Sequence, residues 1–386
     1  DLRTIYNNGL AAYEAGDFQG FLITMQKADS LSPEHPTITY NLAAAYAKNG
    51  NKAMAQTLIT KAIYMNAGFK PEEDPDFEGI DFAVIKELKE FLNKEVSQGQ
   101  IAFTNSELDL HPESVAYDPK SKAFFLNSVR KGKILKYSKG EFEEFSSGHW
   151  AVMGMKVNGQ NLWACEVATN EFQAFDEKDQ GKTALLQFDL KTEKLINRYE
   201  LEGGHWFGDL IFDQDGNPLI SDSMSPIIYT LKEGEIQVFR DCSEELFNLQ
   251  GLALDQNKNL LYIADYKVGL HVLDLSTNEI SKLNHPNTMS TKGTDGLYLY
   301  ENSLIAIQNG VRPFRVSKFT LNQAGKGIES VEYLDKARPE FGEPTLGVLV
   351  GDDLYYVANS PWGAYKDGEF SIEGLKENIV MKLSLK

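Results

Sequence analysis

The fold is decided by the stretch QGLALDQNKNLLYIADY at residues 250–266. It opens with a polar residue and Gly-Leu, continues as a strand, turns at Asp and Asn, and closes with a second strand that ends in Asp. Similar stretches recur along the chain, and together with this one they begin at Glu113, Met153, Gly208, Gln250, Asp295 and Thr345. Successive copies start 40 to 55 residues apart, which is room for one four-stranded blade each. The sequence therefore predicts a six-bladed β-propeller over residues 99–386.

The first hundred residues carry a different repeat, with a shift of 34 residues that aligns Tyr6 with Tyr40. The two copies are YNNGLAAYEAGDFQGFLITMQKADSLSP at 6–33 and YNLAAAYAKNGNKAMAQTLITKAIYMNA at 40–67. Both the period and the segments resemble the tetratricopeptide family of paired helices. The following stretch, DPDFEGIDFAVIKELKEFLNKE at 74–95, places apolar residues at helical spacing and predicts a helix that caps the second repeat.

The predicted fold class is therefore multidomain, α plus all-β. A tetratricopeptide-like helical domain over residues 1–98, with two repeats and a capping helix, precedes the propeller. Arrays of this kind usually bind peptides or proteins, but two repeats are few. Binding of a protein partner and docking on the propeller are both open for these helices.

The chain has a formal net charge of −18. Nucleic acid and anionic membrane surfaces both require clustered Lys and Arg, so neither is expected as a partner. No apolar run reaches the length of about 18 residues that a membrane span needs, whereas an acidic protein leaves room for a bound cation. The sequence begins at Asp1 without Met, which suggests a removed leader and a periplasmic or extracellular location, or otherwise a cytoplasmic one.

The first residue of each copy is expected at one mouth of the propeller's central channel. Strands of a propeller radiate from its axis, so one residue per blade converges there and a site forms from residues far apart in the sequence. The polar ends of the second strands are expected near the same mouth, namely Asn127, Glu166, Asp222, Asp265, Asn309 and Asn359.

The phrases HPESVAYDP at 111–119, LQGLALDQNKNLLYIAD at 249–265 and TDGLYLY at 294–300 resemble the senescence-marker/gluconolactonase/luciferin-regenerating-enzyme family. The resemblance covers roughly residues 105–386. It implies that a Glu, two Asn and an Asp at the axis hold a divalent cation. It also implies hydrolysis of a lactone or ester, in which the cation polarises the substrate carbonyl and orients water or a carboxylate base.

On this resemblance, Glu113 and Asp295 match the family's acidic ligands. Gln250 stands where the family has Asn and keeps an amide oxygen, while Gly208 stands at the other Asn and offers no side chain. The resemblance thus implies a metal site of Glu113, Asp209, Gln250 and Asp295, with calcium as the expected cation and Asp295 also as a catalytic carboxylate. The second blade presents Met153, which does not suit a hard cation.

The dipeptide His-Trp occurs just before two of the innermost strands, as His149–Trp150 and His205–Trp206. At the channel mouth the imidazoles could act as catalytic bases and the indoles could form the wall of a substrate pocket. The same dipeptides could instead be a repeated packing element between blades. Other residues expected to bind substrate on this face are Arg312, Glu343, Asn359 and Trp362.

Two function hypotheses follow from these residues. The first is a gluconolactonase-like hydrolase with an axial divalent cation. The second is a non-catalytic protein that binds a peptide or small molecule and retains a degraded metal site, which Met153 and Gly208 favour.

Overall fold

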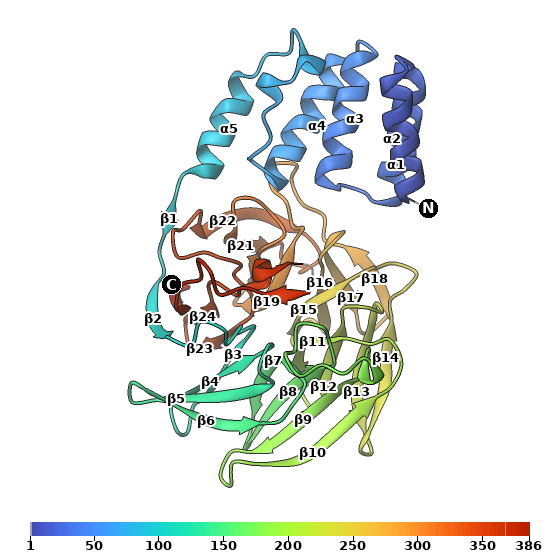
Figure 1. Ribbon diagram of the computed structural model, residues 1–386. Helices are drawn as coiled ribbons and strands as arrows, with labels where there is room; N and C mark the ends of the chain where they lie inside the picture. Colours follow the sequence, from blue (N-terminus) through green and yellow to red (C-terminus); the bar gives the residue numbers. More distant parts are fainter. Residues whose placement is uncertain (1, 367) are drawn as a thin grey trace.

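A computed structural model of the protein describes residues 2–366 and 368–386, and in it a stack of helices stands on a β-propeller (Figure 1). The stack contains α1 (Leu2–Glu14), α2 (Phe18–Leu31), α3 (Pro36–Lys48), α4 (Lys52–Met65) and α5 (Ala83–Asn93). Short 3₁₀ turns occur at Pro71–Glu73, Pro75–Phe77, Glu177–Asp179 and Trp362–Ala364. Helices thus occupy the region where the sequence predicts them.

Local sequence sets the ends of these helices. Gly16 and Gly50 have positive φ angles of 73° and 81°, and they turn the chain between α1 and α2 and between α3 and α4. The Asp17 side chain then accepts the N–H of Gly20 at the start of α2, and Asn51 caps α4 in the same way. The helix pairs stand where the repeats are predicted, while their assignment to the tetratricopeptide family stays a prediction.

The described residues from β1 (Val96–Ser97) onward form the propeller, whose blades are antiparallel sheets. In chain order, blades 1 to 3 are β3 (Val115–Asp118), β4 (Ala123–Ser128), β5 (Lys133–Ser138), β6 (Glu141–Ser147); β7 (Ala151–Asn158), β8 (Asn161–Val167), β9 (Thr183–Asp189), β10 (Lys194–Leu201); and β11 (Phe207–Phe212), β12 (Pro218–Asp222), β13 (Ile227–Lys232), β14 (Glu235–Asp241).

Blades 4 to 6 complete the ring. They are β15 (Leu249–Asp255), β16 (Leu260–Asp265), β17 (Gly269–Asp274), β18 (Glu279–Lys282); β19 (Thr294–Tyr300), β20 (Ser303–Gln308), β21 (Arg315–Leu321), β22 (Ile328–Lys336); and β23 (Gly347–Val350), β24 (Asp353–Val357), β27 (Asn378–Ser384), β2 (Gln100–Asn105). A small hairpin, β25 (Tyr365–Lys366) and β26 (Glu369–Phe370), projects from the last blade. The predicted six-bladed propeller is confirmed.

The ring closes with a strand from the opposite end of the chain. In blade 6, β2 pairs with β27, so residues 100–105 form the outer edge of a sheet whose other strands come from the C-terminal end. The C-terminal segment ENIVMKLSLK therefore supplies the third strand of that blade. This pairing ties both ends of the propeller together without a covalent link.

The helical unit docks directly on the propeller. Arg312, in the loop between β20 and β21, donates its backbone N–H to Met65 O and accepts that of Ala67, both at 2.9 Å. The buried Arg315 donates to Tyr64 O at 2.7 Å. Docking is thus one role of these helices, and their binding of a protein partner stays a prediction.

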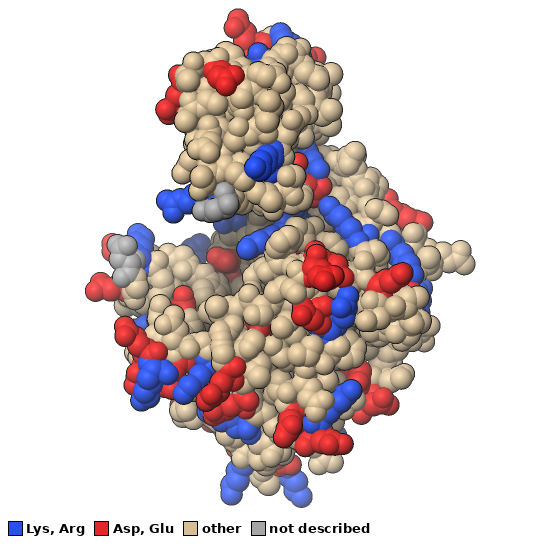
Figure 2. Space-filling view, turned by 90° about the vertical axis from the view of Figure 1, so that its right-hand side faces the viewer, with Lys and Arg blue, Asp and Glu red and all other residues tan. Residues whose placement is uncertain are grey.

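The surface of the molecule is hollowed between the helical unit and the propeller (Figure 2). Within the described residues, no helix has the length and apolar composition that crossing a membrane requires. Export to the periplasm or the exterior stays a prediction.

Buried polar side chains at the ends of second strands fix the loops of the channel mouth. The fully buried Asp265 accepts backbone N–H groups from Phe247 and Asn248 with one oxygen, and from Lys267 and Val268 with the other, at 2.6 to 3.0 Å. Asn127 in blade 1 and Asp222 in blade 3 likewise accept hydrogen bonds from the backbone N–H groups of nearby residues. These side chains therefore stabilise the channel mouth, because they provide hydrogen-bond acceptors for its backbone N–H groups.

Replacing Asp265 with Ala should therefore lower the free energy of unfolding by about 3 kcal/mol or more. The substitution leaves several backbone N–H groups of a buried loop without an acceptor, and hydrogen bonds to charged groups are the stronger ones. Urea unfolding followed by circular dichroism measures the change.

Asp274→Ala is the matched control, because Asp274 also accepts turn N–H groups, from Ser276 and Thr277, but in a more exposed turn. Water can replace its bonds, so the loss should not exceed about 1 kcal/mol. Equal losses in the two variants would contradict the role given to Asp265.

Candidate functional site

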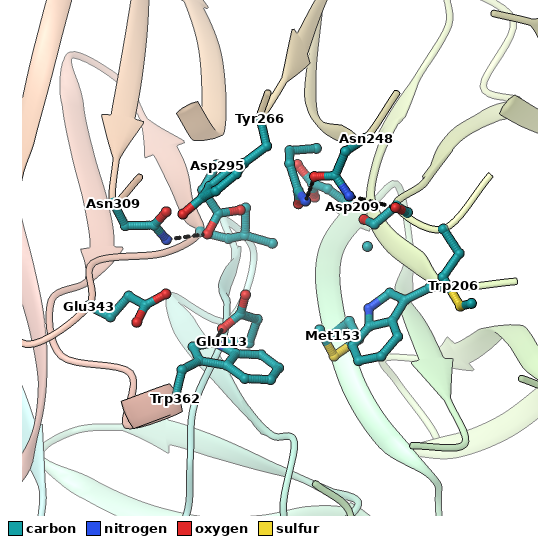
Figure 3. A pocket seen from close by; sticks show the side chains of 15 residues that line it. Glu113, Met153, Trp206, Asp209, Asn248, Tyr266, Asp295, Asn309, Glu343 and Trp362 are labelled. Atoms are coloured by element: carbon teal, nitrogen blue, oxygen red, sulfur yellow. Dashed lines mark hydrogen bonds between the residues drawn. The ribbon is translucent and has the colours of Figure 1, made fainter. Parts of the chain in front are cut away.

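A cavity of about 370 Å³ opens at the mouth of the channel, where the innermost strands converge (Figure 3). Side chains or backbone of every blade contribute to it. Its lining consists of Glu113, Met153, Trp206, Gly208, Asp209, Ser223, Met224, Asn248, Gln250, Tyr266, Asp295, Asn309, Glu343, Leu346 and Trp362.

β-Bulges in the innermost strands direct the side chains of particular residues into this cavity. In β7, Met153 and Gly154 stand between the pairs Val152↔Glu166 and Met155↔Ala164, so two residues oppose one. The same irregularity falls at 208–209 in β11, at 250–251 in β15 and at 295–296 in β19. A bulge interrupts the alternation of a strand and redirects a side chain. Each of these bulges includes the first residue of a sequence repeat.

Glycine in two of the bulges allows the strands to approach closely. A Cβ at Gly154 would lie 2.6 Å from the carbonyl oxygen of Gly208, and one at Gly251 would lie 2.5 Å from that of Asp295. No other residue fits there without moving backbone. The Met-Gly, Gln-Gly and Asp-Gly pairs in the sequence thus reflect crowding at the axis.

Glu113 is the most firmly held carboxylate of the cavity. Its Oε2 accepts the indole N–H of Trp362 at 2.8 Å and the hydroxyl of Ser360 at 3.2 Å, and its side chain is 6% exposed. Burial raises the pKa of Glu113 well above its usual value, and the charges of Asp295 and Glu343 add to the rise. The carboxyl group therefore retains a proton in conditions where an exposed Glu has lost it.

Asp295 lies across the cavity from Trp362 and near Asn309 (Figure 3). Its Oδ2 accepts the amide N–H of Asn309 at 2.7 Å. Burial raises the pKa of Asp295 to about 7, because the Asn309 hydrogen bond only partly offsets the loss of water and the nearby charge of Glu343. Asp295 is thus poised to gain or lose a proton near neutral pH.

Asp209 occupies the opposite side of the cavity and is 1% exposed. Within the described part of the chain neither of its carboxylate oxygens has a hydrogen-bond partner. The ammonium group of Lys156 on β7 lies 3.7 Å from Asp209 Oδ1 and donates to the carbonyl of Gly347 at 3.1 Å. One ion pair at that distance leaves much of the Asp209 charge unsatisfied.

The side chains that line the cavity include the oxygen donors that a hard divalent cation prefers. Carboxylates and amide oxygens are the ligands that calcium takes, and the carboxylates outnumber the cations around the cavity. Within residues 2–366 and 368–386, the Asn309 Oδ1 atom is also buried without a partner. The same residues contain no cluster of three or more His, Cys, Asp or Glu side chains that could hold a metal.

The structure gathers a subset of the residues expected from the sequence. The cavity brings together Glu113, Trp206, Asp209, Gln250, Asp295, Glu343 and Trp362. It is not lined by His149, Trp150, His205, Arg312 or Asn359. The roles of the gathered residues stay predictions.

The histidines instead bond to and pack against other residues of the propeller. His149 is buried, bonds to the Ser146 hydroxyl at 2.8 Å and meets the edge of Phe188, and burial lowers its pKa to about 4. His205 bonds to Asp222 through Nδ1 at 2.7 Å. Neither imidazole lines the axial cavity, and the catalytic role expected for the two histidines stays a prediction beside the packing role that the sequence also allows.

The indoles of the two dipeptides differ in their surroundings. Each Trp backbone N–H donates to a carboxylate at the end of the next strand, Glu166 for Trp150 and Asp222 for Trp206. The Trp150 ring stacks under Arg198 at 4.4 Å, whereas the Trp206 ring faces the cavity (Figure 3).

Arg312 and Asn359 line a neighbouring cavity of about 760 Å³ that shares Glu343 with the first. The Arg312 guanidinium stacks on Phe314 at 3.9 Å and donates to the carbonyl of Asn309 at 2.8 Å. Asn359 bonds to backbone, accepting the N–H of Ile379 and donating to Glu377 O. Both are thus beside the channel mouth but outside its axial cavity.

Several residues of the cavity carry little signal in the sequence. Asn248 and Tyr266 flank β15 and β16, and Lys156, which lies near Asp209, follows the bulge at Met153 in β7. Met224 and Ser223 follow β12. The one available cue is that Tyr266 is the last residue of the stretch 250–266 and that Asn248 precedes this stretch by two residues.

No family model matches the chain, and no curated protein matches it in sequence. Among solved structures, a gluconolactonase from Xanthomonas campestris matches with a TM-score of 0.53 at 13% identity, over 77% of this chain and 92% of that one. This chain shares its propeller fold. A luciferin-regenerating enzyme matches at 0.52 and 14% identity, over 73% and 95% of the two chains.

A putative oxidoreductase (glucose dehydrogenase) from Thermus thermophilus is as similar, with a TM-score of 0.51 and 14% identity over 74% of this chain and 100% of that one. At such identities the likeness extends to the fold alone, and one fold supports several chemistries. The expectation of a six-bladed propeller of this type is confirmed.

The raised pKa of Asp295 predicts how stability depends on pH in chelator-treated protein. The pKa is about 7 in the folded state and near 4 in an unfolded chain, so between these values the folded state holds a proton that the unfolded state releases. The stabilisation is complete below pH 4 and is lost as the pH rises through 7. Asp295→Asn removes this titration and should exceed the wild type in free energy of unfolding at pH 8 by roughly 1–3 kcal/mol.

Urea unfolding at pH 5 and pH 8 measures this difference. Asp215→Asn, at an exposed turn of blade 3, is the control and should follow the wild type at both pH values. An Asp295→Asn variant whose stability falls with pH as steeply as that of the wild type would contradict the assignment.

Proposed function

We propose that the axial cavity hydrolyses a lactone or ester with the help of a divalent cation, calcium being the expected one. The observation that carries the proposal is the set of buried carboxylates that face one small cavity with little neutralising charge. Burying such groups is costly unless a cation or a proton compensates them. Sites of this kind are where perturbed pKa values serve chemistry.

Glu113, Gln250 and Asp295 would hold the cation, with Asp209 contributing from the opposite side. The hydrogen bonds that Glu113 accepts from Trp362 and Ser360 would orient its carboxylate for this role. A cation bound there supplies a Lewis acid that polarises a substrate carbonyl. This set differs from the one that the family resemblance implies at two positions, because Gln250 stands at one Asn and Asp209 would substitute for the other, where Gly208 offers no side chain.

Asp295 is the best placed acid–base group. As a carboxylate beside the cation, Asp295 would accept a proton from attacking water and return it to the leaving oxygen. Asn309 would orient that carboxyl through its hydrogen bond, and Tyr266 lies beside both in the cavity (Figure 3). The likeness in fold to a gluconolactonase supports the same reaction class.

A binding function without catalysis is the second candidate. Met153 and Gly208, which offer no oxygen side chain at two of the axial bulges, favour it. The neighbouring cavity at Arg312 gives such a protein room for a larger ligand or a peptide.

The deciding experiment is hydrolysis of a lactone and ester panel in calcium buffer, with the spontaneous rate subtracted. An enzyme should lose turnover on chelation and regain it with calcium. Glu113→Gln should lower kcat/KM by about 100-fold or more, because it removes a charge that acts at the reacting centre.

Glu279→Gln, on the exposed outer strand β18, is the control and should leave turnover unchanged. Far-ultraviolet circular dichroism checks that both variants are folded. Absence of turnover across the panel, or turnover that survives both chelation and Glu113→Gln, would refute the hydrolase and favour the binding protein.

A further inference from the structure

The axial cavity has two unlike walls (Figure 3). Glu113, Asp295 and Glu343 lie on one side. Trp206 and Met153 lie on the other, where Met224 also lines the cavity. A substrate whose carbonyl lies at the acidic wall would therefore place the rest of its structure against the Trp206 indole and the thioethers of Met153 and Met224.

Trp206 and Met224 are held in place although they are incompletely buried. Asp222, itself fully buried, accepts the backbone N–H of Trp206 at 3.0 Å and of Met224 at 2.9 Å. The Met224 side chain is 58% exposed. Large apolar side chains fixed at the rim of a concave site are typical of surfaces that a ligand covers.

The polar side chains beside this wall are engaged with the protein. Asn248 donates to Ser223 O at 2.6 Å, Gln250 donates to Asn248 Oδ1 at 3.0 Å, and the Ser223 hydroxyl donates to Leu249 O at 2.9 Å. Asp209 also lies on this side with both carboxylate oxygens unpartnered among the described residues, and in the proposed site these oxygens and the amide oxygen of Gln250 face the cation. The indole N–H of Trp206 faces the cavity (Figure 3). With those oxygens engaged by the cation, the rest of this wall offers apolar surface and, apart from the Trp206 N–H, little hydrogen bonding.

A polyhydroxylated sugar lactone fits this wall poorly. Each hydroxyl group that leaves water without a partner loses hydrogen bonds that an apolar wall does not replace. An alkyl or aryl substituent gains from the same surface, because its burial against Trp206 and the methionines removes apolar area from water.

We infer that the substrate is a lactone or ester with an apolar alkyl or aryl substituent, and that Trp206 and Met224 determine this specificity. The inference rests on the proposed hydrolase function for its reaction. The recognition step rests on the cavity wall alone, so binding and turnover test it separately.

The turnover test compares lactones with the same six-membered ring: δ-valerolactone, δ-decalactone and D-glucono-δ-lactone. The wild type should prefer δ-decalactone to D-glucono-δ-lactone by at least about tenfold in kcat/KM. Trp206→Ala should lower kcat/KM for δ-decalactone by about tenfold, mainly through KM, and change that for δ-valerolactone by less than about threefold.

Trp150→Ala is the matched control, because it removes the same residue from the same dipeptide in the adjacent blade, outside the cavity. It should leave the substrate preference unchanged. Preference for D-glucono-δ-lactone would overturn the inference. So would an equal loss for all three lactones in Trp206→Ala, since that pattern indicates a structural role.

The binding test uses lactams, which the proposed reaction does not consume. Calorimetric titration should show that 6-pentyl-2-piperidinone binds at least about tenfold more tightly than 2-piperidinone, and that Trp206→Ala abolishes the difference. This result without lactone turnover would refute the hydrolase and leave apolar recognition standing. Equal or undetectable binding of both lactams would overturn the inference, whatever the turnover.

Discussion

The innermost strands of the propeller converge on one axis, and the site depends on this crowding. Bulges form where the strands are closest, glycine is required at Gly154 and Gly251, and the neighbouring residue of each bulge is turned toward the channel. The same crowding excludes water from Glu113 and Asp295, which is the main reason that their pKa values are raised. Geometry and electrostatics at the mouth thus have one common cause.

Much of this arrangement could be predicted from the sequence, because a propeller repeats one local pattern. The phrases that begin at Gln250 and Asp295 mark the innermost strands, and both residues lie at bulges of the axial cavity. The helical region and the six-bladed ring were predictable for the same reason, since each repeat reports its own local structure. The outer strand of blade 6 was not, because its partner β27 lies almost three hundred residues away in the chain.

Side-chain surroundings were the part that sequence could not supply. His149–Trp150 and His205–Trp206 have the same pattern, yet of the four side chains only the Trp206 ring lines the axial cavity. Arg198 covers Trp150, whereas the mouth of the channel leaves Trp206 open on one face. Lys156 lies 3.7 Å from Asp209 Oδ1 and follows a bulge in β7 that the sequence did not reveal. Such differences arise from contacts between blades, which a repeat shared by all blades does not encode.

We propose that buried carboxyls at the axis hold protons that a divalent cation replaces. The most direct test is calorimetric titration of calcium into chelator-stripped protein at pH 7, in two buffers of different ionisation enthalpy. The difference in heat between the buffers gives the number of protons released. Calcium should bind at a single site with release of about one proton, because a ligand carboxyl must ionise to coordinate the cation. No binding at millimolar calcium, or binding without proton release, would contradict it.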